Sequence, residues 1–462
     1  MDLGLIGIII SLGLLMYLAY KGVPVIVLAP VLAIFAVFMN GLATGNMHIM
    51  INYTNVFMVK MGGFIISNFP LFLLGAIFGR LMTDTGSAEA ISKFICRKLG
   101  KNKAVLATVL STGILTYGGV SAFVVVFCIL PIGCSMFKEA GIPKRFLPGS
   151  IALGAFTFAM TALPGTPQVQ NLIPMKYFGT DSYASPILGL IAAAIMFGGG
   201  MLWLTMRTNK AMATGEGYGD HKENHSETQG NSKLPNILVS ILPIILVLLF
   251  SLILSKVIFP DANLKYLELY GTTPSKVIGS WSIIISLTSV CLLMGAYHHK
   301  NIDNIIDTFD QGAKGALTAI MNTGSEVGYG AVVASLAAFA IVKTAMMGLS
   351  PNPLINGAVA SSVLAGVTGS ASGGLGIALG ALGSTMLEQA NAAGISPQAL
   401  HKIATVACGG LDTLPHNGAV ITLLTVCGLT HRESYLDIGV NTVAIPLFAT
   451  VVIIALGSMG LV

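Results

Sequence analysis

Apolar stretches of about the length of a membrane-spanning helix, separated by short polar segments, make up most of the sequence. Of all residues, 54% are hydrophobic and 9% are charged, against about 25% charged in a soluble domain. The sequence therefore predicts an all-α integral membrane protein with about ten transmembrane helices. The expected spans are Leu3–Tyr20, Val23–Leu42, Val56–Met82, Phe146–Leu163, Ser185–Met206, Leu234–Val257, Val277–Ala296, Ala313–Met347, Ile403–Leu429 and Ile438–Leu461.

Two further apolar stretches, 104–137 and 354–390, are interrupted in the middle by glycine-rich polar turns. The turns are Thr116–Ser121 in the first stretch and Gly366–Gly374 in the second. Such breaks leave backbone groups unpaired, which is tolerated at membrane depth only where the backbone is buried in protein or lines a cavity. Both stretches are therefore predicted to be re-entrant helical hairpins, each entering and leaving by the same face.

The distribution of basic residues predicts a topology. Lysines and arginines flank both ends of the first hairpin, for example Lys98 and Lys103 before it and Lys138 and Arg145 after it. Because positive charge marks the cytoplasmic side, both ends are expected inside. Continued along the chain, this topology makes the second hairpin open to the outside and places both termini outside.

The two halves of the chain resemble each other. Residues 1–207 are predicted to form a first repeat, 208–233 a polar cytoplasmic linker, and 234–462 a second repeat. Each half carries a hairpin followed by a Leu-Pro break, Leu163-Pro164 in one and Leu414-Pro415 in the other. Since the hairpins open to opposite sides, the halves read as inverted-topology repeats, whose substrate site lies at their interface near the midplane.

The prolines at these breaks predict an anion site. Pro164, Pro167 and Pro415 each remove a backbone donor and are expected to unwind a span. The half-helices that result expose N-terminal ends with a partial positive charge, which can bind an anion through backbone N–H groups. The apolar segments carry no deeply placed arginine that could bind the anion in place of these backbone groups.

Polar side chains at the breaks and hairpin turns are the candidate substrate ligands, since they could hold a carboxylate and a hydroxyl group. In the simpler alternative, their hydroxyl and amide groups only satisfy the local backbone. The candidates are Thr116, Ser121, Thr166, Gln168, Asn171, Ser370, Ser372, His416 and Asn417.

Two acids are candidates for proton coupling, because ionisable groups in a membrane are costly and usually functional. Asp412 precedes His416 by four residues, so on a helix the two would share a face, and His416 could join the relay. Glu326 is the second acid. As alternatives, Asp412 caps a helix and Glu326 faces an aqueous cavity.

Other functional classes fit less well. The six cysteines include no close pair, so neither a disulfide framework nor a metal site is expected, and no cofactor or nucleic-acid partner is predicted. An anion channel is the weaker alternative, because opposed hairpins and two broken helices suit alternating access better. An enzyme is not expected, since no nucleophile–base arrangement is evident. Sodium remains open as the coupling ion instead of a proton.

The stretch Ala407–Val420, with Asp412 to Ala419 reading DTLPHNGA, resembles the gluconate permease (GntP) family of the ion transporter superfamily. Thr161–Pro167 and Gly369–Gly374 resemble the family's first break and second hairpin, and the likeness covers nearly the whole chain. It implies a proton symporter in a bacterial inner membrane that imports a sugar acid or small hydroxy acid. It also implies a homodimer with scaffold domains and elevator-like transport domains.

Among family members, the sequence is most similar to those named 3-hydroxybutyrate permeases, through Asp412–Val420 and its continuation to Tyr435. The break sequences also have apolar neighbours such as Leu163, Leu172 and Leu414. These suit a short acid with a methyl end better than a polyol chain. 3-Hydroxybutyrate is therefore slightly favoured over gluconate.

Overall fold

The computed structural model describes residues 3–21, 23–120, 122–221, 234–298, 305–415 and 417–462. Every regular element in these ranges is a helix, so the predicted all-α fold class is confirmed. Apolar residues make up most of the buried core, but many large apolar side chains also lie on the outer surface. A surface of this kind is expected of a protein whose solvent is lipid.

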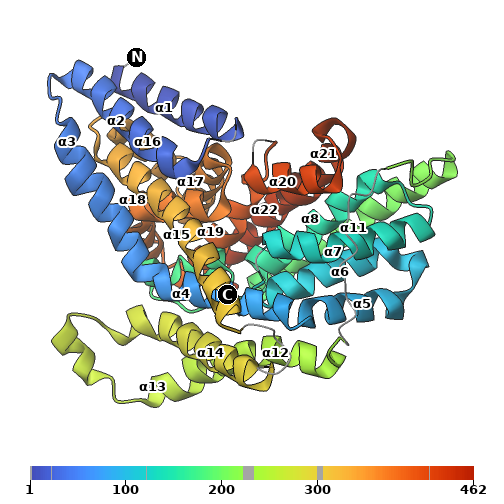
Figure 1. The fold of residues 1–462 in the computed structure, drawn as a ribbon. Coiled ribbons are helices and arrows are strands. Elements are labelled where there is room, and N and C mark those ends of the chain that lie inside the picture. Colours follow the sequence, from blue (N-terminus) through green and yellow to red (C-terminus); the bar gives the residue numbers. More distant parts are fainter. Residues whose placement is uncertain (1–2, 22, 121, 222–233, 299–304, 416) are drawn as a thin grey trace.

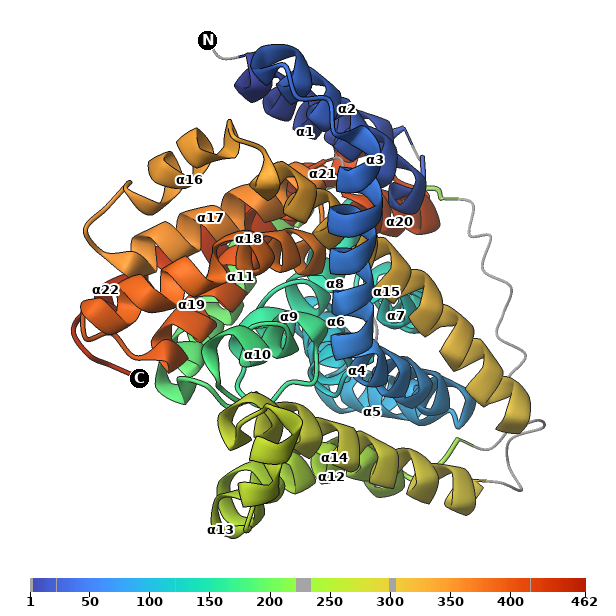
Figure 2. The same ribbon diagram turned by 90° about the vertical axis from the view of Figure 1, so that its left-hand side faces the viewer.

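Long helices form one side of the molecule (Figures 1 and 2). Helices α4 (Met58–Asp84) and α15 (Ile305–Ser335) cross at glycines of α15. A Cβ at Gly312 would overlap the backbone of Ile77, and one at Gly328 would press on Phe57, just before α4. The elements of this side are α1 (Leu3–Tyr20), α2 (Val25–Thr44), α3 (Ile49–Ile51) with a π-helical turn (Asn52–Phe57) leading into α4 (Met58–Asp84), and α15 (Ile305–Ser335).

A separate pair of antiparallel helices packs beside α4 and lies along the lower edge of Figure 1. These are α12 (Ile237–Ile253) and α14 (Pro274–His298), joined through a π-helical turn (Leu254–Ile258), α13 (Phe259–Asp261) and a 3₁₀ turn (Lys265–Tyr270).

Both predicted hairpins are present as pairs of packed helices. The first consists of α6 (Ala104–Tyr117) and α7 (Ala122–Glu139), and the second of α17 (Pro353–Thr368) and α18 (Ala371–Ala392). At 14 residues, α6 is about 21 Å long, too short for a hydrocarbon core of about 30 Å.

The helix that follows each hairpin is broken. After the first hairpin, a 3₁₀ turn (Lys144–Phe146), α8 (Leu147–Ala155) and a π-helical turn (Phe158–Ala162) lead into non-helical residues 163–168, then α9 (Val169–Leu172) and α10 (Met175–Phe178). After the second hairpin, α19 (Pro397–Leu411) leads into residues 412–417 and then α20 (Gly418–Cys427). We call 163–168 the first break and 412–417 the second break.

The remaining helices pack around these elements, with α11 against α22 and α5 against α6 (Figure 1). They are α5 (Ser87–Leu99), α11 (Pro186–Ala213), α16 (Phe339–Met347), α21 (His431–Gly439), a π-helical turn (Val440–Ala444) and α22 (Ile445–Ser458). Helix α11 runs to Ala213, past the predicted start of the linker at Thr208.

The number of full-length spans differs from the expected ten or so. Among the described residues, six helices are long and apolar enough to cross a membrane, or seven if one bent pair counts as a span. That pair is α15 and α16, which meet at 99° although Ala313–Met347 is predicted as one span. No proline or glycine lies between Ser335 and Phe339, so nothing in the sequence marks this bend. Two further predicted spans are interrupted, 146–163 between α8 and the π-helical turn that follows it, and 403–429 at the second break.

Candidate functional site

The first break is hydrogen-bonded to the turn of the first hairpin. The Gln168 side-chain amide donates to the carbonyls of Thr116 (2.6 Å) and Val120 (3.1 Å). In return, the Tyr117 hydroxyl donates to the Pro164 carbonyl at 2.8 Å, and the Thr166 hydroxyl donates to the Tyr117 carbonyl at 3.3 Å. These bonds engage backbone carbonyls of both the hairpin turn and the first break and so join the two segments.

A close contact reinforces this junction. Gly119 has a φ of +95°, a backbone conformation that favours glycine. A Cβ there would lie 2.8 Å from Cγ of Pro167. The hairpin turn and the first break therefore approach more closely than a side chain at Gly119 would permit.

The second break is fastened in the same way. The Asn417 side-chain amide donates to the carbonyls of Gly369, in the turn of the second hairpin, and Asp412, both at 2.8 Å. Its side-chain oxygen accepts from the Val420 N–H at 2.8 Å and so caps α20. Gln168 and Asn417 thus occupy matching positions, each directly before the half-helix that follows its break.

The two halves meet at these elements. Helix α9, after the first break, packs against α18 of the second hairpin and against α19. Helix α20, after the second break, packs against α7 of the first hairpin. Each break is therefore tied to its own hairpin by an amide side chain, and the helix that follows the break packs against the hairpin of the other half.

Most of the predicted substrate ligands lie at this junction, and two of them cannot be placed. Thr116, Thr166, Gln168 and Asn171 lie together around the first break. Around the second break, Asn417 lies beside the hairpin turn where Ser370 caps α18, accepting from the Gly373 N–H at 3.1 Å. Ser372 follows on α18 and is half-buried. Ser121 and His416 lie outside the described residues.

The helix on which Asp412 and His416 were expected to share a face does not extend over the described residues 412–415, and His416 itself lies outside the described residues. Helix α19 ends at Leu411, and the residues from Asp412 to Pro415 form a turn. The cause is Pro415, which prevents the helix from continuing.

Several buried polar atoms at this junction have no hydrogen-bond partner among the described residues. Buried polar groups are nearly always paired, so each such atom requires an explanation. The ones near the breaks and hairpins are Oγ1 of Thr116, Oε1 of Gln170, Oγ of Ser325, Oε2 of Glu326, Oγ of Ser361, Nε2 of His401 and Oδ1 of Asp412. They are groups that a substrate, an ion or a transported proton could satisfy.

Glu326, in the long helix α15, contacts the second hairpin at this junction. Its carboxylate lies so close to Gly373 that a Cβ there would overlap it. Glu326 is 4% exposed and belongs to α15, whereas Gly373 lies in the first turn of α18, whose N-terminal end attracts a carboxylate. A sequence-predicted acid and the turn of the second hairpin are thus in contact.

Lys402 is a site residue that the sequence analysis missed. It is completely buried in α19, and its ammonium group donates to Oδ1 of Asn171 at 3.3 Å. The Asn171 amide in turn donates to the carbonyls of Thr166 (3.0 Å) and Ser182 (2.8 Å). A lysine beside His401 at the start of an apolar run was the available signal, but the predicted span began at Ile403.

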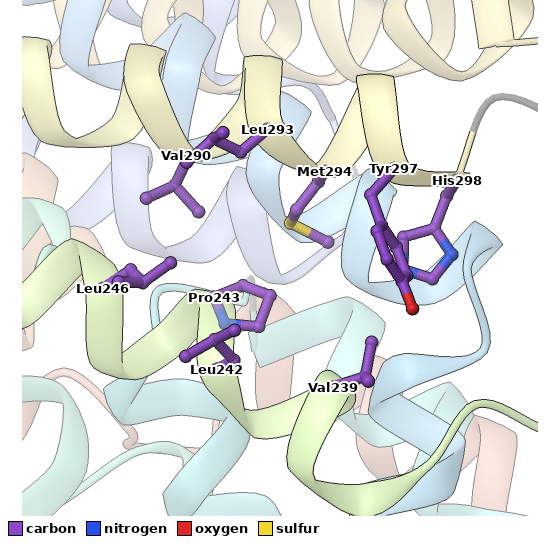
Figure 3. Close-up of a pocket in the computed structure, with 9 residues that line it drawn as sticks. All are labelled: Val239, Leu242, Pro243, Leu246, Val290, Leu293, Met294, Tyr297 and His298. Carbon is purple, nitrogen blue, oxygen red and sulfur yellow. The ribbon is translucent and has the colours of Figure 1, made fainter.

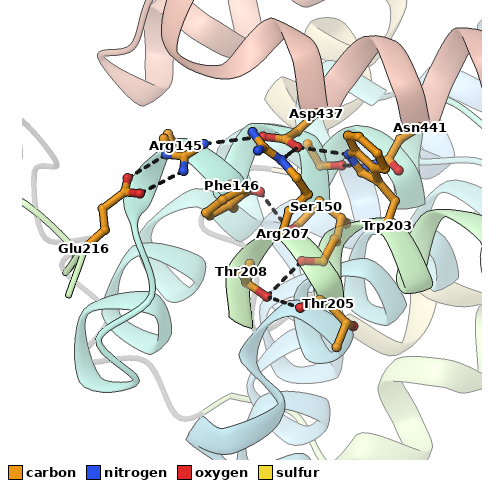
Figure 4. Close-up of polar contacts among 12 residues, drawn as sticks. Arg145, Phe146, Ser150, Trp203, Thr205, Arg207, Thr208, Glu216, Asp437 and Asn441 are labelled. Atoms are coloured by element: carbon orange, nitrogen blue, oxygen red, sulfur yellow. Dashed lines mark hydrogen bonds and ion pairs between the residues drawn. The ribbon is translucent and has the colours of Figure 1, made fainter. Parts of the chain in front are cut away.

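A polar cluster joins the two halves at the far end of α11 (Figure 4). The fully buried carboxylate of Asp437, in α21, accepts from Nε1 of Trp203 (2.9 Å) and Nε of Arg207 (3.2 Å) and pairs with Arg145 (3.9 Å). Arg145 also binds Glu216 through two bonds of 2.6 and 2.8 Å. That hydrogen-bonded guanidinium lowers the pKa of Glu216.

Asp437→Asn is expected to lower the stability of the protein by about 2 kcal/mol, because two arginines lose a buried counter-charge. Glu216→Gln is the control, since its carboxyl is more exposed and its loss is expected to cost less. Thermal unfolding, monitored by size-exclusion chromatography in detergent, gives the melting temperature of both variants. Equal shifts in melting temperature would contradict a central role for Asp437.

An apolar groove of about 260 Å³ between α12 and α14 is a poor substrate site (Figure 3). Apart from the Tyr297 hydroxyl and the His298 ring, its lining side chains are all apolar, among them Leu242, Leu246 and Met294. A carboxylate would lose its hydration there without compensation.

Comparison with known proteins identifies the class to which this junction belongs. A family model described as GntP family permease matches residues 3–459. The chain belongs to the GntP permease family. The family of GntP permeases consists of transporters, and with its long apolar helices the chain is a multi-pass membrane protein.

Individual relatives of this GntP permease are also named as transporters. It is 44% identical over 454 residues to the "Uncharacterized transporter YxjC" of Bacillus subtilis, covering 94% of each chain. A 124-residue part, 27% of each chain, is 25% identical to an "Uncharacterized transporter" of Haemophilus influenzae. Its fold is similar to the crystal structure of the YdaH transporter of Alcanivorax borkumensis, described as having an unusual topology, with a TM-score of 0.52, 14% identity and coverage of 88% and 86%.

Proposed function

We propose that this GntP permease is a proton symporter that imports a short hydroxy acid, with 3-hydroxybutyrate favoured over gluconate. The observation that carries the proposal is that Gln168 and Asn417 bond each break to the turn of its own hairpin, while α9 and α20, which follow the breaks, pack against the hairpin of the other half. Half-helix ends at such a junction provide backbone donors for a carboxylate.

The polar atoms left unpaired at this junction support an anion with a hydroxyl group. Thr116 and Gln170 each contribute an unpartnered oxygen near the first break, and Asp412 contributes an unpartnered oxygen at the second break. A hydroxy acid could donate its hydroxyl to one of these oxygens while its carboxylate meets backbone N–H groups. Apolar neighbours such as Leu172 favour a methyl end over a polyol chain.

Asp412 is the proposed carrier of the coupling proton, with Glu326 as the alternative. Asp412 is buried at the C-terminal end of α19, where the partial negative charge of the helix does not favour a second negative charge. Protonation would remove that conflict on one side of the membrane, and release would restore it on the other.

The transport cycle is proposed to be elevator-like. In this proposal the hairpins and broken helices move together against α2, α4 and α15, in a homodimer located in a bacterial inner membrane with both chain termini outside. Small residues along the contact support it, for example Gly376 against Val327 of α15. Sodium coupling is the second candidate, because hydroxyls and carbonyls at the hairpin turns are oxygen ligands of the kind sodium accepts.

Uptake into proteoliposomes tests this function. Labelled 3-hydroxybutyrate would be supplied with an inward proton gradient, an inward sodium gradient or no gradient, and with unlabelled gluconate as competitor. Proton-driven uptake that resists gluconate is the expected result. Strong competition by gluconate would shift the substrate to a sugar acid, and uptake driven only by sodium would refute proton coupling.

Lys402→Met is expected to raise the KM for uptake at least about tenfold while leaving thermal stability unchanged or improved. A buried charge is costly to the fold, so an apolar side chain of similar length is tolerated, but the proposed anion site loses the buried cation that binds Asn171. The comparison variant is Lys343→Met, at an exposed position on α16. Lower stability with an unchanged KM would show that Lys402 serves only the fold.

A further inference from the structure

Two lysines line one cavity between the long helices and the second hairpin. The cavity has a volume of about 190 Å³ and is bordered by Lys60 and Phe64 of α4, Lys176 and Tyr177 of α10, Val327 of α15 and Ile377 of α18. Neither lysine forms an ion pair with a described residue. No carboxylate is among the residues that line the cavity.

Lys176 is held in place by aromatic rings. Its ammonium group lies 5.3 Å from the centre of the Phe64 ring and 5.0 Å from that of Tyr177. Such contacts stabilise a cation without neutralising it. Lys176 also lines a second cavity of about 260 Å³, which includes Asn68 and Trp281. The positive charge therefore faces two adjoining hollow spaces.

The cavity adjoins the candidate site. Val327 follows Glu326, whose carboxylate contacts the first turn of α18 at Gly373. Ile377 lies one turn further along α18. In the proposed topology the second hairpin opens to the outside, so an anion that arrives from outside would reach this cavity beside the hairpin.

We infer that Lys60 and Lys176 form an anion-binding vestibule that holds the carboxylate of the substrate before the second hairpin admits it. Two uncompensated positive charges in a cavity with apolar walls raise the local concentration of anions. This inference rests on the proposed import of an organic anion and adds an entry subsite distinct from the breaks.

The first test is uptake kinetics in proteoliposomes. Lys60→Gln and Lys176→Gln are each expected to raise the KM for 3-hydroxybutyrate about fivefold or more, with little change in kcat, whereas Lys343→Gln leaves both unchanged. The KM of the wild type should also rise with ionic strength, and that of the double variant should not. Unchanged KM values in both lysine variants would overturn the proposal.

An anionic lipid headgroup has the same chemistry as a carboxylate, so the lipid is varied. The effect of the lysine substitutions on KM is expected in liposomes of pure phosphatidylcholine as well as in mixtures with phosphatidylglycerol. An effect confined to the anionic lipid would overturn the assignment to the substrate.

A second measurement does not depend on transport. Trp281 shares the second cavity with Lys176, and the chain has two tryptophans. Iodide should quench Trp281 fluorescence about twofold less in Lys176→Gln than in the wild type, with equal quenching by neutral acrylamide. Equal iodide quenching in both proteins would refute the vestibule even if uptake fails for other reasons.

Discussion

Gly374→Ala is expected to abolish transport and to leave little folded protein. A Cβ at Gly374 would overlap backbone atoms of Leu364 and Ala365 in the neighbouring helix of the second hairpin. Backbone atoms cannot move aside as a flexible side chain can, so α17 and α18 would have to separate. The expected loss of stability is at least about 3 kcal/mol, and the turn that binds Asn417 would shift with it.

Fluorescence-detected chromatography of the detergent extract and uptake by the same cells measure both effects. Gly198→Ala is the matched control, since it lies in α11 and no atom outside its own stretch of helix lies within 4 Å of the added Cβ. Alanine should be tolerated there, because it favours a helix more than glycine does. Normal yield and uptake for Gly374→Ala would mean that the two helices of the hairpin are not packed as described.

Asp412→Asn is expected to abolish accumulation driven by a proton gradient, lowering it at least about thirtyfold. Asparagine cannot bind and release a proton, but it is nearly the same size and can still hydrogen-bond. Exchange of labelled for unlabelled substrate at equal pH should therefore remain within about threefold of the wild type. The two assays together separate loss of coupling from loss of the binding site.

Two further variants sharpen this result. Asp310→Asn removes an exposed carboxylate of α15 and should change neither assay. Glu326→Gln tests the alternative carrier, and loss of accumulation in this variant with retention in Asp412→Asn would transfer the role to Glu326. Full accumulation in both variants would refute a proton carried by either acid.

The interrupted elements were predictable because their signals are local. Glycine-rich polar turns within apolar stretches predicted hairpins at 104–137 and 354–390, and the structure has helix pairs at 104–139 and 353–392. Prolines likewise marked both breaks, since a proline affects the backbone at its own position. The partners that the unwound residues contact depend on how the helices pack in the folded chain, and the sequence does not show this packing.

Other features depend on contacts between distant segments. The bend between α15 and α16 has no proline or glycine to mark it, and the role of Lys402 depends on Asn171, more than 200 residues away. Asp437 lies near the start of an apparently ordinary span, and only the folded chain brings Arg145 and Arg207 to it. Gln168 and Asn417 were predicted as substrate ligands, but their amide groups bind hairpin carbonyls here and so position the site.

The assignment of the anion site to the two breaks is tested most directly by equilibrium binding of labelled 3-hydroxybutyrate to the purified protein. Gln168→Ala and Asn417→Ala would be compared with the wild type and with Asn391→Ala, at an exposed position near the end of α18. Both break variants are expected to raise the Kd at least about tenfold, or about 1.4 kcal/mol, while Asn391→Ala does not. An unchanged Kd in both folded break variants would contradict the assignment.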